Sequence, residues 1–146
     1  MLEANNDPDL HMMQRCIALA ESAGNEGEYP FAAVIASNGA FLCESANRVK
    51  RDHDVNSHAE IVAISKAQLI RGAHLTDCTI YSTVEPCAQC AYAIREARIG
   101  KVVYGLRSPL MGGALPMEHP LRYESLNGSS RGLPAGARDR IRLPAR

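Results

Sequence analysis

Two short motifs constrain how this chain can fold, because they must meet in space if they form one site. They are His-Ala-Glu at residues 58–60 and Pro-Cys-Ala-Gln-Cys at residues 86–90, with 25 residues between them. Each stands at the start of a predicted helix, where the partial positive charge of the N-terminus favours thiolates over thiols. On the side of a helix, positions two apart point in nearly opposite directions. His58 and Glu60 therefore serve one site only if that site lies beyond the helix tip.

Cys87 and Cys90 suit a soft metal such as zinc, but two thiolates do not complete a zinc site. Taken alone, they are equally consistent with a redox pair or with part of a structural zinc knot. His58 supplies a third ligand, whereas a structural knot needs four, and the sequence has no second Cys-x-x-Cys pair. Three protein ligands leave one position for water, which is typical of a catalytic site. We therefore expect a catalytic Zn²⁺ site formed by His58, Cys87 and Cys90.

The order of the predicted elements indicates an α/β protein. Alternation of helices and strands implies a sheet with some parallel pairing and with helices on its faces. In the helix over 57–72, Ser57 is the expected cap, and Ile61, Ile64 and Gln68 follow the helical pitch. Asn38-Gly39 is a strong hairpin turn between two strands. The predicted elements are a helix from Asp7-Pro8-Asp9 to about Gly24, strands at 31–36 and 40–44, the helix over 57–72, a strand at 78–83, a helix beginning around Pro86, and a strand at 101–105.

The chain has the length of one domain, and we expect a single domain over residues 1–146. Its formal net charge of zero argues against a dedicated nucleic-acid or membrane binder, and no apolar run is long enough to cross a membrane. The acidic, polar start is not a secretory signal, so a cytoplasmic location is expected. After Gly105 the pattern weakens. We expect one further strand near 140–143 and, over about 127–146, a flexible or partner-packed tail.

Together the two motifs resemble those of the zinc-dependent cytidine and deoxycytidylate deaminase superfamily. The segments 29–49, 57–67 and 96–105 resemble the matching regions of guanine deaminases and tRNA adenosine deaminases. The resemblance implies a three-layer α/β/α cytidine-deaminase-like fold, with a central mixed sheet of about five strands and helices on both faces. It also implies a homodimer or larger assembly.

The same resemblance implies that Glu60 is the catalytic residue and not a zinc ligand. In that scheme zinc acidifies a water, and Glu60 passes one proton of the water to a ring nitrogen. Hydroxide adds to the ring, Glu60 returns a proton to the amine, and ammonia leaves.

Three residues are substrate-binding candidates. Asn47 matches a position at which purine-handling members place an asparagine against the base, although an asparagine after a strand is also common turn chemistry. Phe31 is an aromatic that can stack on a flat ring or belong to the core. Ala59, between the histidine and the glutamate, is the third candidate.

We expect hydrolytic deamination of a nucleobase, nucleoside or related aminoheterocycle, with a guanine-type purine as the first choice of substrate. The alternative is adenosine-to-inosine deamination of tRNA, from whose pattern Gln89 and the segment 107–117 depart. A third interpretation is a non-catalytic module that zinc stabilises. The expected partner is a small base or nucleoside, with tRNA as the alternative partner.

The remaining cysteines and histidines carry no motif. Cys16, Cys43 and Cys78 are expected to be small buried apolar residues, and Cys78 is given no ligand role. His53 is expected in a solvated loop. The arginines of the C-terminal segment favour a solvated tail over an RNA-binding arm.

Overall fold

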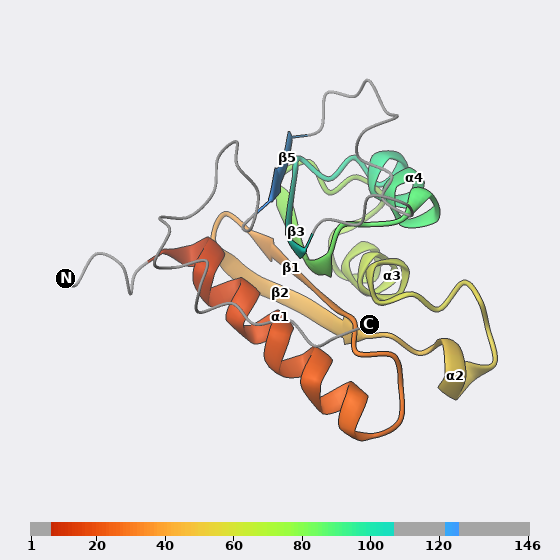
Figure 1. The fold of residues 1–146 in the computed structure, drawn as a ribbon. Coiled ribbons are helices and arrows are strands. Elements are labelled where there is room, and N and C mark those ends of the chain that lie inside the picture. Colours follow the sequence, from red (N-terminus) through yellow and green to blue (C-terminus); the bar gives the residue numbers. More distant parts are fainter. Residues whose placement is uncertain (1–6, 107–121, 126–146) are drawn as a thin grey trace.

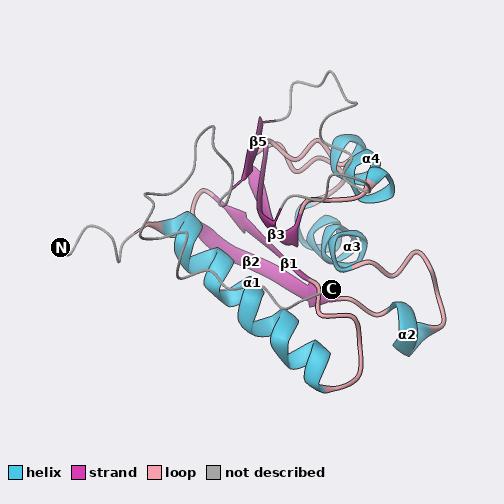
Figure 2. Cartoon of the chain, viewed as in Figure 1, coloured by secondary structure: helices cyan, strands magenta, loops and turns pink. Residues whose placement is uncertain are grey.

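The computed structural model describes residues 7–106 and 122–125, and Figures 1 and 2 show how its helices and strands are arranged. None of the helices in this described part is both long enough and apolar enough to traverse a bilayer. The elements are α1 (Pro8–Asn25), β1 (Ala32–Ser37), β2 (Ala40–Ala46), α2 (Val49–Asp52), α3 (Ala59–Arg71), β3 (Cys78–Val84), α4 (Ala88–Glu96), β4 (Lys101–Leu106) and β5 (Arg122–Ser125).

The strands form one mixed sheet in the order β2-β1-β3-β4-β5. β1 runs antiparallel to β2 and β3, whereas β3, β4 and β5 are parallel to one another. The predicted α/β architecture with a mixed sheet is confirmed. Sequence reasoning missed the four-residue edge strand β5, and the strand predicted near 140–143 and the tail predicted over 127–146 lie outside the described residues.

Helices cover both faces of the sheet, with α1 on one side and α3 and α4 on the other (Figure 1). β1 is an almost uninterrupted apolar run because both of its faces are buried. Its Ala33 and Ile35 side chains pack in the cluster with α3 and α4, whereas Ala32 and Val34 pack in the cluster with α1. The two core clusters therefore lie on opposite faces of the sheet, which gives three layers.

Local signals explain where α1 and the hairpin begin. Asp7 caps α1, since its Oδ1 accepts a hydrogen bond from the backbone N–H of Asp9 at 3.0 Å, and Pro8 occupies the first turn as predicted. Asn38 and Gly39 both have positive φ, 50° and 82°, the backbone form that a tight two-residue hairpin turn requires.

Helix α3 departs from the sequence prediction in two respects. Ser57 does not cap it, because His58 occupies the N-cap position and the Ser57 hydroxyl lies 3.2 Å from Asp54 Oδ2. The face that packs on the sheet carries mainly small residues, Ala59, Ala63 and Ala67 with Ile64, whereas Ile61 and Gln68 are only partly buried. Alanines let the helix axis approach the sheet closely. A search for large apolar residues at helical spacing does not detect such a face.

One edge of the sheet gathers the segments that form the site. Ala32, at the start of β1, pairs with Ala46 at the end of β2, and Ala33 pairs with Ser82 near the end of β3. Antiparallel pairing therefore brings the residues before β1, after β2 and after β3 to the same edge. The loop into α3 joins them through a hydrogen bond from the Arg48 N–H to the Ser57 carbonyl at 2.9 Å.

Candidate metal centre and substrate pocket

Two helix starts bring three ligand candidates together. His58 is the N-cap residue of α3, Cys87 is the N-cap residue of α4, and Cys90 lies in the first turn of α4. The Nδ1 atom of His58 is 3.6 Å from the Cys87 sulfur and 3.4 Å from the Cys90 sulfur. All three ligand atoms lie within 4.8 Å of one another. The two motifs therefore meet beyond the helix tips, as their spacing predicted.

These distances fit a tetrahedral zinc ion. Zinc–sulfur and zinc–nitrogen bonds of about 2.3 and 2.0 Å at a tetrahedral angle put sulfur and nitrogen ligands about 3.5 Å apart. The observed sulfur–nitrogen separations of 3.4 and 3.6 Å match that value. One imidazole and two sulfurs are also the donor types that zinc prefers. The three side chains thus fit a bound zinc ion.

The two thiols have pKa values shifted in opposite directions. The pKa of the Cys87 thiol is lowered to about 5, first because Cys90 donates a hydrogen bond to it and further because the Cys90 and Gln89 backbone N–H groups and His58 stabilise the thiolate. The pKa of Cys90 is raised, first through its interaction with Cys87 and further because it is buried close to the Glu60 carboxylate. A metal ion would bind both sulfurs as thiolates and release the thiol proton of Cys90.

Glu60 is buried beside the ligand group but is not a member of it. Its Oε1 accepts a hydrogen bond from the Ser82 hydroxyl at 2.7 Å, and its Oε2 accepts one from the Cys90 thiol at 3.1 Å. A carboxylate held next to the ligands, but outside them, is free to exchange protons.

Ser82 is a site residue that sequence reasoning missed. It is fully buried on β3, and besides Glu60 its hydroxyl lies 2.6 Å from the Val84 carbonyl oxygen. A hydroxyl buried in an apolar strand needs a hydrogen-bond partner. The position of Ser82 in such a strand was therefore a sequence signal that its hydroxyl makes a hydrogen bond. The partner itself is not local in sequence, and only the packing of α3 against β3 identifies it.

A pocket of about 390 Å³ opens beside the ligand group. It brings together five of the predicted site residues: Phe31, Asn47, His58, Glu60 and Cys87. Cys90 is buried and does not line it, and neither does Ala59, which is fully buried in the core cluster under α3. The lining residues are Tyr29, Pro30, Phe31, Asn47, Val49, His58, Glu60, Val84, Glu85 and Cys87, of which Tyr29, Pro30, Val49, Val84 and Glu85 had not been predicted.

Asn47 combines turn chemistry with a place in the pocket wall. Its Oδ1 accepts a hydrogen bond from the Val49 N–H at 3.0 Å, and its own N–H donates to the Phe31 carbonyl at 2.9 Å. Because Oδ1 is occupied by a backbone donor, the orientation of the amide is fixed and Nδ2 is the group left for a ligand. Asn47 is therefore oriented to donate a hydrogen bond from Nδ2 to a ligand.

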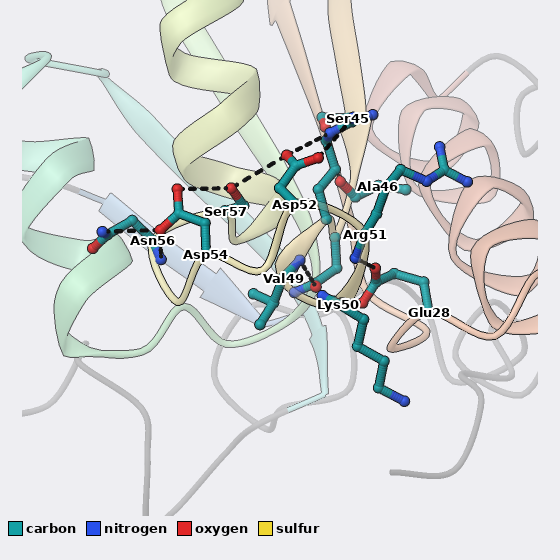
Figure 3. A network of polar contacts seen from close by, with 12 residues as sticks. Glu28, Ser45, Ala46, Val49, Lys50, Arg51, Asp52, Asp54, Asn56 and Ser57 are labelled. Atoms are coloured by element: carbon teal, nitrogen blue, oxygen red, sulfur yellow. Dashed lines mark hydrogen bonds and ion pairs between the residues drawn. The ribbon is translucent and has the colours of Figure 1, made fainter.

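Polar contacts connect the loop before His58 to helices α2 and α4. Asp54, Asn56 and Ser57 form one end of the network in Figure 3, and Glu28 with Lys50 and Arg51 forms the other. Gln89, which stands between the two cysteines, donates a hydrogen bond from Nε2 to Asn56 Oδ1 at 2.8 Å. This bond links the start of α4 to the segment that carries His58.

The remaining predictions on cysteines and histidines are confirmed where the structure describes the residues. Cys16, Cys43 and Cys78 are buried and make no disulfide, and His53 lies in an exposed turn.

Comparison with known proteins points to one family. The model of the cytidine and deoxycytidylate deaminase zinc-binding region matches residues 6–106. A tRNA-specific adenosine deaminase of Agrobacterium fabrum (strain C58) is 39% identical over 106 residues, which cover 72% of this chain and 69% of that protein.

Two solved structures are also similar to the chain. One, from biochemical and structural studies of A-to-I editing by tRNA:A34 deaminases at the wobble position of transfer RNA, has a TM-score of 0.73 and 34% identity and covers 79% of this chain and 96% of its own. The other, guanine deaminase from Bacillus subtilis, has a TM-score of 0.64 and 38% identity and covers 66% of this chain and 63% of its own.

Proposed function

The chain belongs to the family of the cytidine and deoxycytidylate deaminase zinc-binding region, and we propose that it deaminates an adenosine of transfer RNA to inosine. Membership makes the chain a zinc-dependent hydrolytic deaminase. The observation that carries the choice of substrate is the 39% identity to a tRNA-specific adenosine deaminase, which extends over 72% of the chain and far beyond the two motifs. It supports the tRNA alternative better than the guanine-type substrate that the sequence first suggested.

His58, Cys87 and Cys90 are the proposed zinc ligands, and Glu60 is the proposed catalytic residue. Zinc, when bound, supplies an acidified water at the position that the three side chains leave open. Glu60 would take one proton from the attacking water and give it to a ring nitrogen of the base; it would then take the second proton, from the hydroxyl added to the ring carbon, and give it to the amine, which leaves as ammonia. Ser82 holds Oε1, so Oε2 is the oxygen that carries the proton once Cys90 is a thiolate ligand and no longer donates.

Asn47 and Phe31 are proposed to receive the base. Asn47 Nδ2 donates a hydrogen bond to an acceptor on the heterocycle, because its Oδ1 is already bonded to the Val49 N–H. Phe31 supplies an apolar wall for a flat ring. Ala59 is buried away from the pocket, so any contribution to binding would have to come through its backbone.

Cationic side chains beside the pocket support a polynucleotide substrate. Arg48, Lys50 and Arg51 belong to or adjoin α2, and Val49 of the same segment lines the pocket. Such groups attract phosphates, although Arg48 is paired with Asp52 and Arg51 with Glu26. Since the formal net charge of the chain is zero, attraction to RNA must come from such local charge.

The substrate is tested with a tRNA transcript that carries adenosine at the wobble position, and with the same transcript carrying guanosine there. We expect inosine and ammonia from the first only, and a binding affinity that falls steeply between low and moderate salt. Conversion of free guanine without any conversion of the transcript would reject the proposal. The second candidate, guanine deamination, is supported by the similarity to the Bacillus subtilis enzyme, and this assay decides between the two.

The proposed role of Glu60 separates an enzyme from a zinc-stabilised binding module. The Glu60→Gln variant keeps the size of the side chain but cannot carry a proton. It should retain zinc and lose ammonia release by on the order of a thousandfold. If the variant keeps its activity, the proposed mechanism is wrong.

We further propose a homodimer in the cytoplasm. Leu69 and Ile70 at the end of α3 are 90% and 59% exposed, and Tyr92 on α4 is 61% exposed, an apolar surface that association would cover. Sedimentation at assay concentrations tests the assembly, and a fully active monomer would reject it.

A further inference from the structure

The side walls of the pocket come from two segments that no strand pairing holds along their length. Tyr29, Pro30 and Phe31 form one wall, before β1, and Asn47 and Val49 form the other, after β2. At their base the Phe31 carbonyl accepts a hydrogen bond from the Asn47 N–H at 2.9 Å. Beyond that bond, the Glu28 side chain makes hydrogen bonds to both segments.

The Glu28 carboxylate joins these two segments. Its Oε1 accepts hydrogen bonds from the backbone N–H of Tyr29 at 3.0 Å and of Lys50 at 3.2 Å, and its Oε2 accepts one from the N–H of Arg51 at 3.0 Å. Figure 3 shows this carboxylate next to the start of α2. One side chain thus satisfies a donor in the first wall and two donors that follow the second.

Helix α2 depends on this carboxylate because it is only four residues long. A single helical turn is unstable alone, and its first N–H groups have no partner within the helix. Arg48, at the N-cap, makes no side-chain cap. The N–H of Val49 is bonded to Asn47, and those of Lys50 and Arg51 to Glu28, so Glu28 replaces the missing cap.

Two further contacts connect the same segments. The Lys50 ammonium lies 4.3 Å from the centre of the Tyr29 ring, and Arg51 pairs with Glu26 at 3.1 Å. Although partial desolvation acts in the opposite direction, the backbone N–H groups of Arg51, Tyr29 and Lys50 lower the pKa of Glu28. The carboxylate is therefore ionised at neutral pH and acts only as an acceptor.

We propose that Glu28 is a positioning residue, whose carboxylate holds the 29–31 wall and the 47–49 wall at the separation that substrate binding requires. Its carboxylate bonds the backbone of Tyr29, Lys50 and Arg51, none of which is a proposed zinc ligand or the proposed catalytic residue. Its loss should weaken substrate binding and leave the chemical step almost unchanged. The kinetic part of this inference rests on the proposed function, whereas the structural part does not.

The test uses the zinc-loaded, full-length chain and the variants Glu28→Gln and Glu28→Ala. The matched control is Glu21→Gln, which neutralises an exposed glutamate on α1. Amide hydrogen exchange at Lys50 and Arg51, followed by NMR, reports on the capping bonds. KM and kcat for ammonia release report on the pocket, and zinc content and thermal midpoint report on the fold.

Both Glu28 variants should accelerate exchange at Lys50 and Arg51 by about tenfold. They should raise KM by roughly tenfold, with kcat within about twofold of the unsubstituted chain. Zinc content should not change, and Glu21→Gln should match the unsubstituted chain throughout.

Unchanged exchange at Lys50 and Arg51 in both variants would overturn the proposal. So would equal losses of kcat and zinc, because Glu28 would then serve the fold and not the pocket. If the unsubstituted chain releases no ammonia from tRNA or free bases, the proposed function fails, and the exchange measurement alone still decides whether Glu28 holds the two walls.

Discussion

Glu60 is held by side chains from two other elements, and its role depends on both. Ser82 of β3 bonds Oε1, and Cys90 of α4 bonds Oε2. The motif around Glu60 predicted a proton carrier next to a metal, and the spacing of His58 and the cysteines predicted the donor set. The hydroxyl that orients the carboxylate was not predictable, because Ser82 and Glu60 are brought together only by the packing of α3 on the sheet.

The first prediction concerns Ser82. In Ser82→Ala, Glu60 Oε1 loses its donor in a buried site, so the carboxylate should reorient. We expect kcat to fall by on the order of tenfold to a hundredfold. The free energy of unfolding should fall by about 1–3 kcal/mol, and zinc should be retained. Ser65→Ala, on the exposed side of α3, is the matched control. Unchanged kcat in Ser82→Ala would show that Glu60 needs no such support.

The second prediction concerns Cys87 after zinc is removed with a chelator. A lowered pKa means that the thiolate is already populated at neutral pH, where an ordinary thiol is mostly protonated. The rate of alkylation should therefore rise through a midpoint near pH 5, the pKa of Cys87. Cys90, whose pKa is raised, should react slowly across this range. Peptide mass spectrometry distinguishes the two sites, and a Cys87 midpoint above pH 8 would contradict the lowered pKa of this thiol.

At the scale of elements, sequence signals were reliable where they act locally. Asp7 and Pro8 start α1, and Asn38-Gly39 forms the hairpin turn, because caps and turns depend on neighbouring residues. The same reasoning failed for α2 and β5, which are each four residues long. Elements of that length have too little propensity to form alone and exist because other segments satisfy their backbone groups.

The third prediction concerns the docking of α1. The Asp9 carboxylate accepts a hydrogen bond from the Tyr81 hydroxyl at 2.6 Å and pairs with Lys101 at 2.9 Å, which joins α1 to β3 and β4. Asp9→Ala should lower the free energy of unfolding by about 1–3 kcal/mol, measured by urea denaturation. Zinc content and KM should not change, because the pocket lies elsewhere. Glu21→Ala is the exposed control on the same helix, and an equal effect there would refute the assignment.

For the whole molecule, the metal site joins α3 to α4 at the sheet edge where the pocket opens. His58 and the two cysteines come from different helices, so a bound ion ties together segments that are distant in sequence. A ligand that binds only the folded chain stabilises it in proportion to the logarithm of its free concentration.

The fourth prediction is that chelation lowers the thermal midpoint and that added zinc restores it. The stabilisation should reach about 4 kcal/mol when free zinc is roughly a thousand times its Kd. Scanning calorimetry of the chelated, zinc-loaded and Cys87→Ser proteins measures the effect. The Cys87→Ser protein should resemble the chelated one and respond little to zinc. A chelated protein as stable as the loaded one would show that zinc does not bind only the folded state.

The sequence by itself predicted the donor set and the α/β class, because these follow from residue chemistry and from the order of the elements, and the resemblance of its motifs predicted the role of Glu60. The tertiary structure decided which residues meet the site from afar: Ser82 behind Glu60, Glu28 between the pocket walls, and five unpredicted residues in the lining. The physical reason is that antiparallel pairing of β1 with β2 and β3 places three chain segments at one edge of the sheet. No local pattern records contacts made across such a distance.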